Sequence, residues 1–361
     1  MSATLASARE SRPLVVGTRV RRLPMLDGLR AISVALVVFS HLQATRGFPT
    51  FAPLAPIVGD LGSLGVRVFF VISGFLITHL LIEEERRNGR ISLSDFYARR
   101  AIRILPALGV FLLAMFVGER LGWLLLRPGD WFHALTFTMD YSPRPGWPMG
   151  HLWSLSVEEQ FYLVWPALIV VLGMASALRV AMAVVILMPV LRVALWVGIP
   201  QYRDYMDQSF ETVADALAIG CVLAGVRTSL GRRRLYLALI GSRAFVLVPM
   251  LVAFINSQEI HPIAFMLVGE TVMNAGIAVI IDWSLRNPDG YIGAVFESRP
   301  ARFVGVRSYS LYLWQQPFLN HRATAFATSF PINIVLACVA AILSYALVER
   351  PFAKLRTKFS S

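Results

Sequence analysis

The sequence is poor in several residue types, and each scarcity excludes a class of protein. Its two cysteines, Cys221 and Cys338, lie in apolar runs without CxxC or metal-ligand spacing, so we assign them no role and expect no metal site. Lysine occurs only at Lys354 and Lys358. Residues 1–23 have no uninterrupted apolar core, so no cleavable signal peptide is expected. The whole sequence is 56% hydrophobic with a mean hydropathy of +0.62, which indicates a polytopic membrane protein rather than a soluble one.

Apolar runs long enough to cross a bilayer recur along the chain and predict an all-α fold with about ten spans. We divide the 361 residues into an N-terminal tail (1–25), a transmembrane domain (26–350) and a C-terminal tail (351–361). The expected spans are 27–47, 62–83, 102–125, 151–173, 177–198, 210–227, 235–255, 262–282, 303–321 and 331–348.

Arginine is concentrated in alternate connections between these spans. The basic clusters fall in 9–22, 86–103, 232–234, 286–302 and 350–358, whereas the other connections hold only scattered arginines. By the positive-inside rule, both termini are expected to be cytoplasmic. Because this topology accounts for the net charge of +12, nucleic-acid binding is not expected.

The first span carries Arg30 and His41 in an otherwise apolar run. At about 100° and 1.5 Å per residue, eleven residues place both side chains on one helix face, about 16 Å apart along the axis. Ionisable groups on one intramembrane stripe indicate a pathway or a reaction centre. The alternative is that Arg30 is a snorkelling anchor and His41 a packing residue. Asp27, on nearly the same face, is expected to orient Arg30.

The second span contains a notch of small residues at Ser73 and Gly74. Close helix packing is the simplest explanation for it. The other interpretation is that the notch leaves room for a bound chain.

The stretch 94–108 places Arg100 and Arg103 three residues apart, on one face of the expected helix. Paired guanidinium groups suit a phosphate-bearing ligand, because each can bind phosphate oxygens bidentately. Anionic lipid headgroups would satisfy the same residues.

The fourth span begins GHLWSLSVEEQFYLVWP and places Glu158 roughly 10 Å below the outer surface. His41 lies at a similar depth in its own span, so the two side chains could meet. A carboxylate beside an imidazole fixes its tautomer and raises its basicity, as a general base requires. The alternative is a polar pair that serves helix association alone.

Taken together and in this order, the stretches LDGLRAISVALVVFSH, FFVISGFLIT, FYARRAIRILP, GHLWSLSVEEQFYLVWP and YSLYLWQQPF resemble the membrane-bound acyltransferase-3 family of bacterial O-acyltransferases. The resemblance implies a multi-pass inner-membrane enzyme that moves an acyl group, usually acetyl from cytoplasmic acetyl-CoA, to a hydroxyl of a glycan. The family's motifs fall on Arg30 and His41, on Arg100 and Arg103, and on 153–158.

The sequence departs from the family at two points. Members often carry a histidine where this chain has Gln315, so no catalytic duty is assigned there. Many members also carry an extracytoplasmic hydrolase-like domain that this sequence lacks, so a stand-alone form is expected.

The resemblance and the residues together imply a mechanism. Arg30, Arg100 and Arg103 would hold acyl-CoA, a co-substrate rather than a bound cofactor, while His41 acts as base or acyl carrier with Glu158 in support. The residues expected to support the site or bind the acceptor are Asp27, Ser73, Trp153, Tyr309 and Tyr312.

The expected partners are the lipid bilayer, acyl-CoA and a carbohydrate or lipid-linked glycan. Three alternatives stay open: acylation of a small secondary metabolite such as a macrolide, proton-coupled export, and a non-catalytic scaffold.

Overall fold

The computed structural model describes residues 24–43, 45–49, 60–257 and 262–356, whose regular structure is helical without any strand. The all-α prediction is confirmed. The N-terminal tail before residue 24, with its arginine cluster, and residues 357–361 lie outside the described residues. The last helix, α18 (Arg350–Arg356), includes residue 351, where the expected C-terminal tail begins.

Eight helical segments among the described residues are long and apolar enough to cross a membrane, so the chain is a multi-pass membrane protein. A ninth is added by α10 (Arg234–Gly241) and η4–α11 (Arg243–Val246, Leu247–Ser257) if that pair, bent by 71°, is one span. Which side of the membrane each terminus occupies stays a prediction. The eight are α1 (Pro24–Gln43), α3 (Leu61–Asn88), α4 (Leu93–Arg120), α6 with α7 (Trp147–Gly150, Leu152–Leu172), α8 (Met174–Gly198), α9 (Phe210–Leu230), η5 with α13 (Phe265–Gly269, Glu270–Arg286), and α17 with η7 and α18 (Ile332–Ser344, Tyr345–Glu349, Arg350–Arg356).

The span expected at 303–321 is instead two short helices, α15 (Arg299–Val306) and α16 (Ser308–Phe318). The helix breaks at Arg307, and the 11 residues of α16 rise only about 16 Å, roughly half of a hydrocarbon core. Ser310, Gln315 and Gln316 of α16 are buried in the protein, which explains why this segment carries amide groups inside an apolar run.

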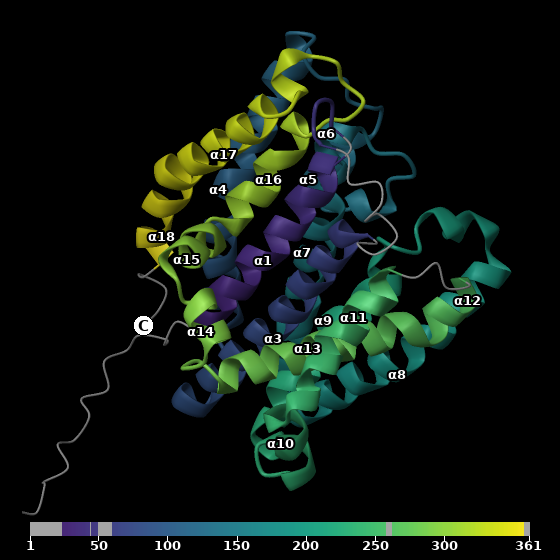
Figure 1. Cartoon of the computed structure of the whole chain (residues 1–361), viewed down its shortest axis with the longest axis vertical. Coiled ribbons are helices and arrows are strands. Elements are labelled where there is room, and N and C mark those ends of the chain that lie inside the picture. The colour runs from purple at the N-terminus through teal and green to yellow at the C-terminus, as the bar shows by residue number, and fades with distance from the viewer. Residues whose placement is uncertain (1–23, 44, 50–59, 258–261, 357–361) are drawn as a thin grey trace, which may run out of the picture.

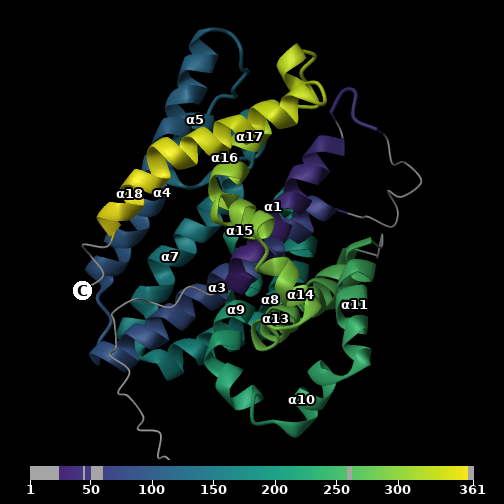
Figure 2. The same ribbon diagram turned by 60° about the vertical axis from the view of Figure 1, so that its left-hand side comes forward.

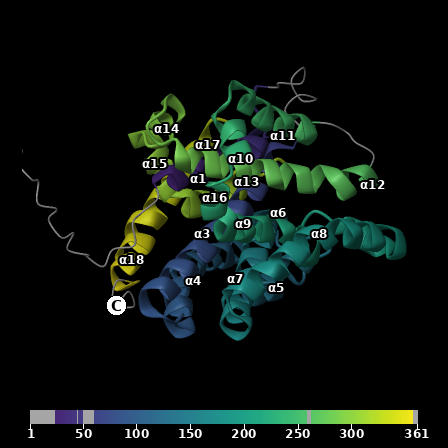
Figure 3. The same cartoon turned by 90° about the horizontal axis from the view of Figure 1, so that it is seen from below.

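Helix α1 passes through the middle of the molecule and packs against α3, α15 and α16 (Figure 1). Figure 2 shows α10 at one end of the molecule and α5 and α17 at the other. In the view from below, α3 and α9 lie between α1 and α13 on one side and α4 and α7 on the other (Figure 3). The remaining elements are short: α5 (Asp130–Thr136), η2 (Met139–Tyr141), η3 (Pro200–Asp204), α12 (Pro262–Ala264), α14 (Tyr291–Phe296) and η6 (Phe326–Thr328).

The notch at Gly74 is filled by protein. A Cβ at Gly74 would lie 1.9 Å from the carbonyl oxygen of Leu217, and one at Gly220 would lie 2.2 Å from that of Val71. The notch is therefore the close crossing of α3 and α9, as the packing interpretation predicts. At Gly74 the crossing leaves no room for a bound chain.

A buried ion network joins α3, α8, α9 and α13. Arg67 donates to Glu270 (2.8 Å), and Arg192 lies 3.2 Å from the same carboxylate while also binding Asp215. Asn274 donates to Asp215 at 3.1 Å. These side chains are all buried, so the two positive and two negative charges compensate one another inside the membrane domain.

Candidate active site

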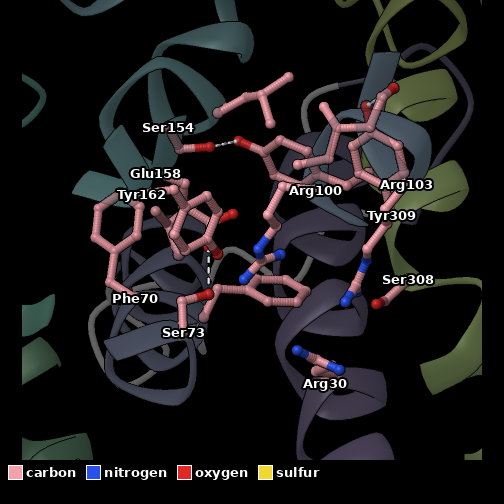
Figure 4. A pocket seen from close by; sticks show the side chains of 15 residues that line it. Arg30, Phe70, Ser73, Arg100, Arg103, Ser154, Glu158, Tyr162, Ser308 and Tyr309 are labelled. Carbon is pink, nitrogen blue, oxygen red and sulfur yellow. Dashed lines mark hydrogen bonds between the residues drawn. The ribbon is translucent and has the colours of Figure 1, made fainter. Parts of the chain in front are cut away.

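Three arginines meet in a cavity of about 670 Å³ that we call the arginine cavity. Arg30 comes from α1, and Arg100 and Arg103 come from one face of α4 (Figure 4). The predicted grouping of these residues is therefore what the structure shows. Ser73, Glu158, Tyr309 and Tyr312 line the same cavity.

The arginine cavity has an excess of positive charge. Arg30 lies 4.0 Å from Asp27, and the orienting role of that carboxylate stays a prediction. The guanidinium of Arg100 lies 3.8 Å from the centre of the Tyr162 ring. Within the described ranges neither Arg100 nor Arg103 forms an ion pair, and Glu158 is the acidic residue in the lining. Three guanidinium groups around one carboxylate form a site for an anion.

Ser73 and Tyr309, two residues expected in the site, form hydrogen bonds with other groups of the protein. Ser73 donates a hydrogen bond of 2.6 Å to Glu158, so the notch residue and the carboxylate form one unit (Figure 4). The hydroxyl of Tyr309 donates to the carbonyl oxygen of Ile104 at 3.1 Å.

His41 lines a second cavity of about 980 Å³, which we call the histidine cavity. Its Nδ1 lies 2.8 Å from Oε1 of Gln315, a buried residue of α16. Because a carbonyl oxygen can only accept, Nδ1 carries the proton and Nε2 keeps a free lone pair. This is the tautomer that a base or nucleophile at Nε2 requires.

The aromatic ring of Trp147 lies beside His41 in this cavity, with ring centres 5.3 Å apart. Its Nε1 donates to the carbonyl oxygen of Gln316 (2.8 Å), and Nε2 of Gln316 donates back to the carbonyl oxygen of Trp147 (2.5 Å). This reciprocal pair fixes α6 to α16. Trp153, expected from its motif, also lines the histidine cavity.

The expected contact between His41 and Glu158 is corrected by the structure. Glu158 lines the arginine cavity and accepts from Ser73, whereas His41 lines the histidine cavity and bonds to Gln315. Similar depth in the membrane does not decide which way two side chains face. The face of α7 that carries Glu158 also carries Ser154, and it is directed to the arginines.

Tyr312 forms the boundary between the two cavities, because it and Val66 line both. Its hydroxyl lies 2.9 Å from the carbonyl oxygen of His151 and 2.5 Å from Oγ of Ser154. It therefore donates to the carbonyl and accepts from Ser154.

The acyltransferase domain that defines the acyltransferase-3 family matches residues 23–349. The chain belongs to this family. It is 29% identical to the peptidoglycan O-acetyltransferase OatA of Listeria monocytogenes, over 92% of this chain and 56% of that protein. It is 30% identical to YrhL of Bacillus subtilis, whose name provisionally assigns it to peptidoglycan O-acetylation, over 92% of this chain and 55% of that protein.

The chain thus spans just over half the length of these acyltransferase-3 relatives. No solved structure matches it. Among the described residues, no group of three histidine, cysteine or acidic side chains is placed to hold a metal ion.

Gln315 and Trp147 both contact His41, and the sequence predicted no role for either. Gln315 lies in the expected motif, but its difference from the family's usual histidine made it look inactive. Trp147 lies in a Pro- and Gly-rich connection, where only its aromatic character gave a signal.

Proposed function

We propose that this chain transfers an acyl group, acetyl in the simplest case, from acyl-CoA to a hydroxyl of a cell-surface carbohydrate. The observation that carries the proposal is an arginine cavity, in which Arg100 and Arg103 form no ion pair with the described residues, next to a cavity that holds His41 in a basic tautomer. Membership of the acyltransferase-3 family and the names of its peptidoglycan-modifying relatives support the reaction class and the acceptor class.

The donor binds with its phosphates at Arg30, Arg100 and Arg103. Hydrogen bonds to charged groups contribute about 1.5–3 kcal/mol each, so three guanidinium groups suffice to hold a multiply charged nucleotide. The pantetheine arm then follows α1 past Val66 and Tyr312. The distance of about 16 Å from Arg30 to His41 along the helix suits an extended arm of this kind.

The chemistry takes place at Nε2 of His41. In the direct route, Nε2 takes the proton of the acceptor hydroxyl while the hydroxyl oxygen attacks the thioester carbonyl. The carbon–sulfur bond breaks, and the proton passes from the imidazolium to the departing thiolate of CoA. In the covalent route, Nε2 itself attacks the thioester and releases the thiolate; the acceptor oxygen then displaces the imidazole, and the hydroxyl proton passes through the freed Nε2 to the thiolate of CoA. Both routes use the tautomer that Gln315 sets.

The proposal is tested with purified protein in nanodiscs, labelled acetyl-CoA and isolated cell-wall glycan. Release of free CoA together with ester-linked label on the glycan, both absent without protein, is the expected result. Folded protein that neither binds acetyl-CoA nor labels the glycan would overturn the proposal, and movement of an unmodified substrate across a vesicle membrane would instead identify an exporter.

A further inference from the structure

The histidine cavity has a lining that differs from that of the arginine cavity. Its aromatic groups are the indoles of Trp147 and Trp153 and the ring of Tyr312. Its polar groups include two carboxylates and two carboxamides, and they surround the same space as His41. The residues are Asp60, Asp207, Gln208 and Gln316.

We infer that the histidine cavity is the acceptor site and binds a neutral pyranose unit, stacked on indole and hydrogen-bonded by Asp207 and Gln208. This inference rests on the proposed function, and it assigns the acceptor to a site distinct from that of the donor.

Aromatic rings and hydrogen-bonding side chains together match the two surfaces of a pyranose. The axial C–H groups form an apolar face that packs on an indole, while the equatorial hydroxyls at the rim donate to carboxylates and bond to amides. In the histidine cavity these two kinds of group surround one space, so a sugar can satisfy both at once.

The charge of the cavity excludes an anionic acceptor group. Among the described residues, the lining has two carboxylates, Asp60 and Asp207, against one guanidinium, that of Arg322. A phosphate or carboxylate placed here would face a net negative lining, whereas the arginine cavity accommodates such a group. The two cavities therefore separate the charged donor from the neutral acceptor.

The position of Trp147 directs the sugar to the reacting group. Its indole is fixed by the reciprocal hydrogen bonds with Gln316 and lies in edge contact with His41. A pyranose stacked on this ring brings a rim hydroxyl beside the imidazole. The lining thus positions the acceptor as well as binding it.

The test uses the full chain in nanodiscs with acetyl-CoA and soluble oligosaccharides of N-acetylglucosamine as the acceptor probe. The variants are Asp207→Asn and Trp147→Phe, with Asp204→Asn as the matched control, because Asp204 lies in the same connection but outside the cavity lining. We expect Asp207→Asn and Trp147→Phe to raise the acceptor KM about tenfold with an unchanged Kd for acetyl-CoA, and Asp204→Asn to change neither.

If the acceptor KM is unchanged in both cavity variants, the inference is overturned. Acetyl transfer by the wild type in the same experiment still upholds the proposed function. The converse result is that the two variants weaken oligosaccharide binding but the wild type transfers no acetyl group. That result upholds the acceptor site and overturns the transferase proposal. Because Asp207→Asn is isosteric and lies outside the helices, it keeps the test informative if Trp147→Phe fails to fold.

Discussion

Nδ1 of His41, which lines the histidine cavity, and Oε1 of Gln315 lie 2.8 Å apart and join α1 to α16. The glutamine accepts the Nδ1 proton and so leaves Nε2 of the imidazole free to react. We therefore predict that Gln315 is a positioning residue, which acts on the substrate only through His41.

Removing this hydrogen bond should slow the chemical step. Gln315→Leu leaves the imidazole free to rotate and to change tautomer, and we expect kcat to fall about 10- to 100-fold, as on removal of residues that hydrogen-bond and orient metal-binding histidines. Gln315→Glu retains an accepting oxygen and should recover much of the loss. Single-turnover acetyl transfer at saturating acetyl-CoA measures both. A wild-type kcat in Gln315→Leu would show that the contact does not position His41.

The arginine cavity should control donor affinity. Replacing Arg100 or Arg103 by alanine removes charge-assisted hydrogen bonds of about 1.5–3 kcal/mol, so the Kd for acetyl-CoA should rise at least about tenfold in each variant. Arg99→Ala is the control, because Arg99 is paired with Glu84 and lies outside the cavity lining. Titration of acetyl-CoA at several salt concentrations measures the effect. Equal affinity in all three variants would show that Arg100 and Arg103 do not bind the anion.

The buried ion network should stabilise the fold rather than the reaction. Asp215→Ala leaves Arg192 without its hydrogen-bonded carboxylate, and breaking a buried pair in this way costs about 3–5 kcal/mol. Glu83→Ala removes an exposed pair with Arg86 and should cost less than about 1 kcal/mol. Thermal unfolding in one detergent compares them, and equal Tm values would mean that the network is not stabilising.

Asp140 should make stability depend on pH. It lies buried in η2, where burial raises the pKa of its carboxyl to about 6, although Gln160 donates to it at 3.0 Å. An unfolded Asp has a pKa near about 3.9. The folded state therefore holds the proton more tightly, and its contribution to stability is present below about pH 4 and is lost as pH rises to about 6.

At about 1.4 kcal/mol per pH unit, this loss amounts to a few kcal/mol, and Asp140→Asn abolishes it. The difference in Tm between variant and wild type should grow from pH 4 to pH 6 and then stay level. A difference that does not change over this range would contradict the assignment.

The sequence predicted much of the arginine cavity, because the information for it is local. Spacing places Arg100 and Arg103 on one helical face, and the stripe from Arg30 to His41 follows from a single continuous helix, α1. The resemblance to the acyltransferase-3 motifs added the prediction that these stretches meet in one site.

Contacts between distant helices could not be predicted in the same way. The partner of His41 depends on how α16 faces α1, and depth in the membrane favoured Glu158 instead of Gln315. The network of Arg67 and Glu270 joins residues 203 positions apart, each a single charge in its own apolar run. Similarly, the break at Arg307 is invisible to a hydropathy window that averages across it.

The central claim is that His41 performs the transfer, and one comparison tests it most directly. Wild type, His41→Ala and the control His133→Ala are purified in nanodiscs, and acetyl transfer to glycan is measured beside the Kd for acetyl-CoA. His133 lies in α5, away from both cavity linings. We predict that His41→Ala binds acetyl-CoA normally and transfers no acetyl group, while His133→Ala behaves as wild type. Undiminished transfer by folded His41→Ala would contradict the account.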